Sequence, residues 1–295
     1  MTSSDFPIEQ KMHPARFAVI GNPVKHSRSP SIHQLFAQQT GISLVYDRIE
    51  APIDQFESTM ASFFAQGGRG LNVTVPFKQQ AWQLAIAHLS PRARLAQAVN
   101  TLWREHDALH GCNTDGVGLV RDLERLGVHG REARILLIGA GGAARGVIGP
   151  LLETGCAQLK IVNRTAARAQ ELISICREAY PDTRQHISAG GLADAKKVGG
   201  WDIVINASSS SLGDKPPELP EGLYANGALA YDMMYGARAT PFMLQAQNDG
   251  AQSTCDGLGM LVGQAAESFY IWHGIRPEIA PVLNAIRAEL DASIT

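Results

Sequence analysis

A glycine-rich turn between an apolar run and a helical pattern constrains the fold of this chain more than any other feature. Residues 135–138 are apolar and lead directly into Gly139-Ala140-Gly141-Gly142-Ala143-Ala144. The spacing fits G-x-G-x-x-[G/A] with a strand before the glycines and a helix after them, which is typical of dinucleotide-binding units. Gly139 permits the tight turn, and Gly141 lets backbone amides approach a pyrophosphate. A glycine turn can also serve packing alone, but the flanking elements favour nucleotide binding.

Strands and helices alternate on both sides of this turn. We predict a first α/β unit with strands at 17–20, 44–49 and 72–75, and a doubly wound unit with strands at 135–138, 159–162, 203–205 and 229–231. Two or three helices follow, one of them at 257–273 and one after Pro277. The predicted fold class is therefore α/β, with an N-terminal α/β domain, a doubly wound Rossmann nucleotide-binding domain and C-terminal helices that close the molecule.

The length of 295 residues favours two domains. We place a flexible N-terminal extension at 1–15 and a substrate-binding domain at 16–114 together with 257–295. The nucleotide domain is placed at 115–256. The extension is polar and lacks the apolar segment of a signal peptide, so we expect a cytoplasmic protein.

Charge and composition argue against several classes of function. A formal net charge of −2 gives no basic footprint for nucleic acid or an anionic membrane. No apolar stretch approaches the ~20 residues that span a bilayer. Cys112, Cys156, Cys176 and Cys255 lie far apart in the sequence, so we expect buried free thiols and no metal site.

The residues after the predicted strand at 159–162 indicate which nucleotide is bound. An NAD site usually has an acidic residue about 20 positions after the glycines. This chain has Asn163, Arg164 and Thr165 there, and Arg168 one helical turn later. Guanidinium groups bind a 2′-phosphate, whereas a carboxylate would repel it. The arginines could instead be a solvated helix start, but cations are unfavourable at a helix N-terminus, so we predict NADP.

A second polar segment predicts a pocket wall in the first unit. In Asn72-Val73-Thr74-Val75-Pro76-Phe77-Lys78, strand alternation puts Asn72 and Thr74 on one side. Pro76 ends the strand because it cannot donate the next backbone hydrogen bond. Lys78 is then left near the carboxyl end of the strand, where open α/β sheets bind ligands.

Six polar runs together carry a resemblance to a known family. They lie at 26–30, 72–78, 98–101, 113–116, 231–235 and 256–264. Their order, spacing and composition resemble the NADP-dependent shikimate/quinate dehydrogenases, from about Phe17 to the last helix. The resemblance implies NADPH-dependent, reversible reduction of 3-dehydroshikimate to shikimate in aromatic amino-acid (chorismate) biosynthesis.

The resemblance also implies a role for individual residues. It matches Ser27 and Ser29, helped by Tyr235, to the groups that hold the substrate carboxylate. It matches the following residues to those that bind the ring hydroxyls: Asn72, Thr74, Asn100, Asp115 and Gln264. The catalytic pair corresponds to Lys78 and Asp115, and contacts near the nicotinamide correspond to Met233 and Gly257. The cofactor site is completed by the glycine turn and by Asn163, Arg164, Thr165 and Arg168.

The chemistry leaves the proton donor open at this point. Reduction of a ring ketone places negative charge on its oxygen, so a positioned proton donor is needed. Burial favours a neutral lysine, whereas a neighbouring carboxylate favours a charged one. Either Lys78 or Asp115 could therefore transfer the proton, and we prefer Lys78. Taken alone, Lys78 could be a surface residue, Asp115 could cap a helix starting at Gly116, and Ser29 could be an N-cap.

Two alternative functions also stay open. One is a quinate/shikimate dehydrogenase of looser specificity, and the other is an NADP-responsive regulator without turnover. Retention of Lys78, Asp115 and the hydroxyl-binding positions argues against the regulator. We expect small-molecule partners only, in a monomer or homodimer.

Overall fold

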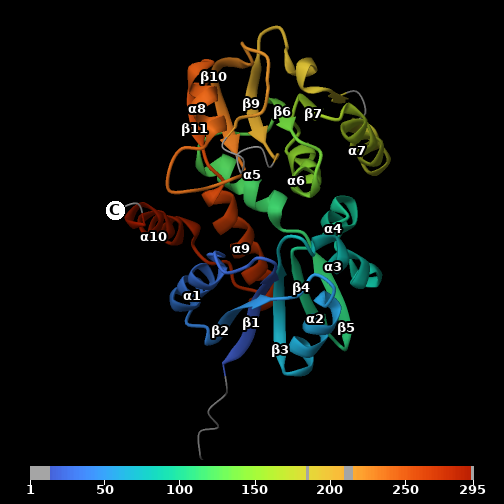
Figure 1. Cartoon of the computed structure of the whole chain (residues 1–295), viewed down its shortest axis with the longest axis vertical. Coiled ribbons are helices and arrows are strands. Elements are labelled where there is room, and N and C mark those ends of the chain that lie inside the picture. The colour runs from blue at the N-terminus through green and yellow to red at the C-terminus, as the bar shows by residue number, and fades with distance from the viewer. Residues whose placement is uncertain (1–13, 184–185, 209–214, 294–295) are drawn as a thin grey trace, which may run out of the picture.

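Two β-sheets with helices on both faces form two lobes of the chain, one above the other in Figure 1. The computed structural model describes residues 14–183, 186–208 and 215–293. The predicted α/β fold class is confirmed. Most of the predicted extension at 1–15 lies outside the described residues, although Ala15 already belongs to the first strand.

The sheet of the first lobe is mixed, with strand order β2-β1-β3-β4-β5. Its strands are β1 Ala15–Gly21, β2 Leu44–Glu50, β3 Gly68–Val73, β4 Thr101–Glu105 and β5 Ala108–Cys112. β1 pairs in parallel with both β2 and β3, whereas β4 and β5 are antiparallel additions at one edge. The carboxyl ends of β1 and β3 therefore lie side by side.

Helices cover both faces of this sheet because the residues of β1 alternate between two cores. Phe17 and Val19 pack on one face, whereas Ala18 and Ile20 pack on the other. The helices of this lobe are α1 Ser29–Thr40, α2 Phe56–Ala65, α3 Lys78–Leu84 and α4 Pro91–Ala96. A short 3-10 helix spans Ile86–His88.

The sheet of the second lobe is parallel throughout, with order β11-β10-β9-β6-β7-β8. Its strands are β6 Arg134–Ile138, β7 Gln158–Val162, β8 Ile187–Gly190, β9 Trp201–Asn206, β10 Tyr224–Asp232 and β11 Ser253–Cys255. Numbered along the lobe, this is the 3-2-1-4-5-6 order of dinucleotide-binding sheets. The sequence pattern did not predict β8 and β11, because both are too short to show a periodicity.

Helices also cover both faces of the second sheet. They are α6 Gly142–Glu153, α7 Ala166–Ala179 and α8 Pro241–Asn248, with short 3-10 helices at Pro181–Thr183 and Leu192–Ala195. Ile135 and Leu137 of β6 belong to the core shared with α6 and α7. Leu136 and Ile138 belong to the opposite core, which includes Phe242 of α8. A strand buried on both faces explains the continuous apolar run in the sequence.

Two helices lie between the sheets (Figure 1). They are α5 Asp115–Arg125 and α9 Leu258–His273, and α10 Ile279–Ala292 then packs against α1 and α9. A Cβ atom at Gly118 would lie 2.6 Å from the Met260 carbonyl oxygen, and one at Gly263 would lie 3.0 Å from the Gly118 carbonyl oxygen. The two backbones therefore touch, and only glycine fits at this contact.

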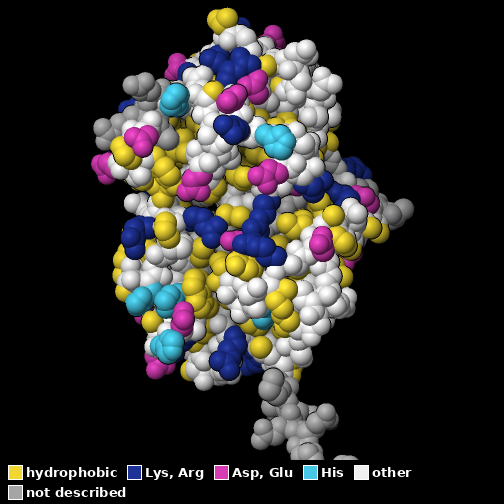
Figure 2. Space-filling view, turned by 180° about the vertical axis from the view of Figure 1, so that it is seen from behind, with side chains coloured by type: hydrophobic (Ala, Val, Ile, Leu, Met, Phe, Trp, Pro, Cys, Tyr) yellow, Lys and Arg dark blue, Asp and Glu magenta, His cyan; other side chains and the backbone are white. Residues whose placement is uncertain are grey.

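Glu267 of α9 joins several segments of this region through ion pairs. Its buried carboxylate accepts from Arg92, Arg121 and Arg276 at distances of 2.7–3.2 Å. Burial alone would raise the pKa of Glu267, but these arginines lower it. Figure 2 shows basic side chains gathered across the waist between the lobes on this face.

The predictions for the cysteines, membrane spans and domain limits have different outcomes. Cys112, Cys156 and Cys176 are buried free thiols as predicted, whereas Cys255 is only partly buried. Among the described residues, no helix is both long enough and apolar enough to cross a membrane. The domain limits stay a prediction.

The glycine contact generates a stability prediction. We expect Gly118→Ala to lower the free energy of unfolding by about 1–3 kcal/mol, because the new methyl group meets backbone atoms of α9 that cannot move alone. Glu124→Ala, at an exposed position of α5, is the control and should change it by less than about 0.5 kcal/mol. Chemical denaturation measures both. Equal stability of wild type and Gly118→Ala would contradict the close crossing.

Candidate active site

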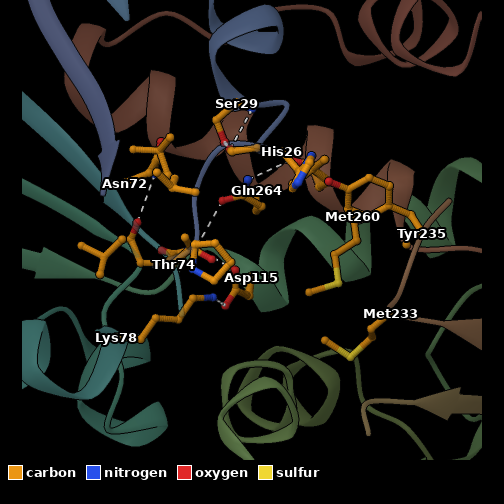
Figure 3. Close-up of a pocket in the computed structure, with 18 residues that line it drawn as sticks. His26, Ser29, Asn72, Thr74, Lys78, Asp115, Met233, Tyr235, Met260 and Gln264 are labelled. Atoms are coloured by element: carbon orange, nitrogen blue, oxygen red, sulfur yellow. Dashed lines mark hydrogen bonds and ion pairs between the residues drawn. The ribbon is translucent and has the colours of Figure 1, made fainter. Parts of the chain in front are cut away.

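A cavity of about 360 Å³ lies where the carboxyl ends of β1 and β3 face the second lobe (Figure 3). Its lining includes every residue predicted for substrate binding and catalysis, together with Met233 and Gly257. These are Ser27, Ser29, Asn72, Thr74, Lys78, Asn100, Asp115, Met233, Tyr235, Gly257 and Gln264. All six polar runs of the sequence thus meet in one place.

Lys78 and Asp115 form an ion pair in this cavity. Lys78 is the first residue of α3 and Asp115 the first residue of α5, and Lys78 Nζ lies 2.7 Å from Asp115 Oδ2. The side chain of Lys78 is 28% exposed and that of Asp115 is 10% exposed. The amine therefore faces the cavity and is not a fully solvated surface group (Figure 3).

Asn100 holds the other oxygen of the same carboxylate. Its Nδ2 donates to Asp115 Oδ1 at 2.7 Å, and its Oδ1 accepts from the Thr114 N–H at 2.9 Å. A backbone N–H only donates and a carboxylate only accepts, so these two partners fix which way the amide points. Both oxygens of Asp115 are thus engaged by donors.

The interpretation of Asp115 as a simple helix cap is wrong. The helix begins at Asp115 itself, and its side chain caps no backbone group; the preceding Thr114 occupies the cap position. Instead, the side chain of Asn113 accepts from the Asp115 N–H at 3.1 Å. The Asp115 carboxylate therefore points into the cavity.

The predicted N-cap role of Ser29 is also wrong. Ser29 is the first residue of α1, preceded by Arg28 at the cap position. Ser27 Oγ accepts from the Ser29 N–H at 3.3 Å and lies 3.2 Å from Ser29 Oγ. Arg48 of β2 donates to the Ser27 carbonyl at 2.7 and 3.0 Å, which holds this loop against the sheet. The two hydroxyls consequently face the cavity together.

The strand that carries Asn72 ends earlier than predicted, so Asn72 and Thr74 do not both lie on it. β3 ends at Val73, and Thr74 continues the wall because its N–H donates to the Ile20 carbonyl. Asn72 is buried among polar groups: it accepts from Tyr46 at 2.7 Å and donates to the Asn100 carbonyl at 3.1 Å.

Sequence reasoning missed several residues of this network. Ser268 of α9 lies 3.0 Å from Asn72 Nδ2 and 2.8 Å from Thr101 Oγ1. Tyr46 lies on an edge strand whose sequence contains no motif, and Ser268 is one of the polar residues of a largely apolar helix. Only the fold brings them behind the pocket. His26, which had no predicted role, also lines the cavity.

A second cavity of about 590 Å³ lies at the carboxyl ends of the strands in the other lobe. The glycine turn forms its floor, with Gly139 at φ 110°, a conformation that L side chains rarely adopt. A side chain at Gly141 or Gly142 would meet no protein atom within 4 Å. These glycines keep space free in front of the α6 N-terminus, which fits a pyrophosphate.

The residues predicted to select NADP border this second cavity. Asn163, Arg164, Thr165 and Arg168 all line it, with Ala140 and Ala143 of the turn. Asn163 Nδ2 donates to the Thr165 carbonyl at 2.9 Å, which fixes the start of the loop. The two cavities approach each other at neighbouring strand ends, where the Met233 N–H donates to the Asn206 carbonyl at 2.9 Å.

Comparison with known protein families identifies the chain. Residues 19–102 match the shikimate dehydrogenase substrate binding domain, and residues 123–212 match shikimate / quinate 5-dehydrogenase. Residues 257–287 match the shikimate 5'-dehydrogenase C-terminal domain. The chain belongs to the shikimate dehydrogenase family.

Individual relatives in this family agree over nearly the whole chain. A shikimate dehydrogenase (NADP(+)) from Bordetella petrii is 63% identical, covering 93% of this chain and 96% of the relative. The structure of an Ael1 enzyme from Pseudomonas putida is similar at 42% identity and TM-score 0.85, covering 92% and 97% of the two chains. The Thermus thermophilus shikimate 5-dehydrogenase with NADP(H) and shikimate has 30% identity and TM-score 0.78, covering 93% and 99%.

Metal ligands are not assembled in the part of the chain that the structure describes. No group of three or more His, Cys, Asp or Glu side chains is placed to hold an ion there.

His33 lies behind the cavity and is fully buried. Its ring stacks on Tyr46 with centroids 4.3 Å apart and planes 9° apart. Burial lowers the pKa of His33 from 6.5 to about 3. The folded chain therefore keeps this imidazole neutral in a pH range where the unfolded chain protonates it.

This shift generates a pH prediction. Because the folded pKa is lowered, the stabilisation is complete above about pH 6.5 and is lost as pH falls towards about 3. Near pH 5 the loss from this group is about 2 kcal/mol. In chemical denaturation, His33→Phe, which cannot titrate, should lose less stability than wild type between pH 7 and pH 5. Identical pH dependence of the two proteins would contradict the buried neutral imidazole.

Proposed function

We propose that this chain catalyses the NADPH-dependent, reversible reduction of 3-dehydroshikimate to shikimate, in aromatic amino-acid (chorismate) biosynthesis. The observation that carries the proposal is the ion pair of Lys78 and Asp115, 2.7 Å apart in a polar cavity between the lobes. The names of the relatives support the substrate and the cofactor.

The cavity suits a small ring that carries a carboxylate at one end. Ser27 and Ser29 present two hydroxyl groups, and Tyr235 borders the same cavity. Together they bind the carboxylate on this proposal. Asn72, Thr74, Asn100 and Gln264 line the walls and contact the ring hydroxyls.

The glycine turn and the arginine loop would hold NADP(H). Backbone N–H groups at the α6 N-terminus would bind the pyrophosphate, and Arg164 and Arg168 would bind the 2′-phosphate. NADPH, when bound, supplies the hydride for the carbonyl carbon. Met233 and Gly257 border the substrate cavity on the side of the second lobe, where the nicotinamide would enter.

Lys78 serves as the proton donor in the reduction. Its ammonium holds a proton at Nζ and gives it to the carbonyl oxygen as the hydroxyl forms, and the amine accepts it back in the reverse reaction. Asp115 receives hydrogen bonds on both oxygens, from Lys78 and Asn100, which favours its role as an acceptor that orients the amine.

Substrate and cofactor are the partners on this proposal. A cytoplasmic location and a monomeric or homodimeric state stay predictions. NADPH oxidation on adding 3-dehydroshikimate separates the enzyme from an NADP-responsive regulator, since the regulator binds NADPH without turnover. Turnover with quinate under the same conditions tests the looser specificity.

Removal of the amine tests the proton donor. We expect Lys78→Ala to lower kcat about 10²-fold or more, with a smaller change in KM, because an interaction made in the transition state is lost. Steady-state kinetics measure this, and NADPH binding checks the fold. Lys196→Ala, an exposed lysine of the second lobe, is the control. A kcat within threefold of wild type would show that another group donates the proton.

Removal of the two guanidiniums tests the cofactor site. The double variant Arg164→Ala with Arg168→Ala should weaken NADPH binding about 100-fold or more, since each charge-assisted hydrogen bond contributes about 1.5–3 kcal/mol. Shikimate binding should change much less. A double alanine variant at the exposed Arg69 and Arg131 makes the same change in net charge elsewhere and serves as the control. NADPH binding as tight as in the control would contradict the assignment, whereas equal weakening of both ligands would indicate misfolding.

A further inference from the structure

Strand β2 supports the substrate cavity without lining it. No residue of Leu44–Glu50 borders the cavity. Two of its residues nevertheless contact the wall from behind: Arg48 donates to the Ser27 carbonyl, and Tyr46 donates to the Asn72 side chain. An edge strand thus contacts both the proposed carboxylate-binding loop at Ser27 and the proposed hydroxyl-binding wall at Asn72.

The direction of each hydrogen bond around Asn72 follows from its partners. The Asn100 carbonyl, 3.1 Å away, can only accept, so the amide nitrogen of Asn72 must face it. The same nitrogen donates to Ser268 Oγ at 3.0 Å, which uses its second hydrogen. The amide oxygen then faces Tyr46, and the Tyr46 hydroxyl must be the donor in the 2.7 Å hydrogen bond.

In this arrangement Asn72 can form one further hydrogen bond, as an acceptor. Both N–H hydrogens point to protein acceptors, and one lone pair of Oδ1 is taken by Tyr46. The second lone pair of Oδ1 remains for a ligand, so Asn72 can accept a hydrogen bond from a ring hydroxyl but has no hydrogen to donate. Its orientation is therefore matched to a hydroxyl group, which can donate.

Tyr46 is itself buried and packed against a second ring. It is 8% exposed, and its ring stacks on the fully buried His33 with centroids 4.3 Å apart. Burial raises the pKa of Tyr46 well above its usual value, while a contact from Ser29 opposes the shift. The hydroxyl therefore keeps its hydrogen over the whole range in which an enzyme works.

We propose that Tyr46 is a positioning residue for the substrate, which acts by fixing the Asn72 amide as an acceptor for a ring hydroxyl. The proposal rests on the proposed function, because it takes the ligand of this cavity to be shikimate. Tyr46 does not line the cavity, so it acts on the substrate through Asn72, while the stack with His33 holds its ring in place.

The test compares Tyr46→Phe with wild type in steady-state oxidation of shikimate. The phenyl ring keeps the stack on His33, but the hydrogen bond to Asn72 is lost. A neutral hydrogen bond corresponds to a change of about threefold to tenfold, so the KM for shikimate should rise by about that factor. The kcat and the KM for NADP+ should stay within about twofold. Tyr270→Phe, which removes a partly exposed hydroxyl from α9, is the matched control.

A double-variant cycle separates positioning from a general loss of packing. On an Asn72→Ala background, Tyr46→Phe should cause no further rise in the KM for shikimate, because the group that it orients is already absent. An unchanged KM in Tyr46→Phe, a parallel rise in the KM for NADP+, or the same rise on the Asn72→Ala background would each overturn the proposal. Absence of turnover in wild type would instead overturn the proposed function, and the role of Tyr46 would fall with it.

Discussion

Helices α5 and α9 cross so closely at Gly118 and Gly263 that no side chain separates their backbones. The rest of the structure depends on this contact, because α9 contributes Met260 to the core of the second lobe and Phe269 to that of the first. The same crossing sets the catalytic geometry. Asp115 begins α5, and Gln264 lies on α9, so the distance between the two helices decides how these side chains face the cavity.

The polar side chains behind the cavity have fixed hydrogen-bond directions, because each series of hydrogen bonds ends on a backbone group that can only donate or only accept. The Thr114 N–H orients Asn100, and the Asn100 carbonyl orients Asn72. Such a network is preorganised, so little reorganisation is needed when a polyhydroxylated ligand binds. Its supporting residues lie outside the lining, on β2 and α9, where Tyr46 and Ser268 make their contacts.

Much of the fold and of the lining could be predicted from the sequence, since glycine turns, apolar strands and polar runs at strand ends are local patterns. The glycine turn at Gly139 and the polar run at Asn72 indicated both cavities. Local patterns fail where a residue's role depends on distant partners. Tyr46 and Ser268 carry no signal until two strands and a helix meet, and Asp115 looked like a cap because a helix starts there.

The central claim is that the Lys78 amine faces the reacting carbon between the two lobes. A crystal structure of the chain with shikimate and NADP+ tests it most directly. The account predicts that Lys78 Nζ lies within about 3 Å of the hydroxyl that is oxidised, with the nicotinamide on the opposite side of that carbon. A structure in which Lys78 turns to bulk solvent, or contacts only the substrate carboxylate, would contradict it.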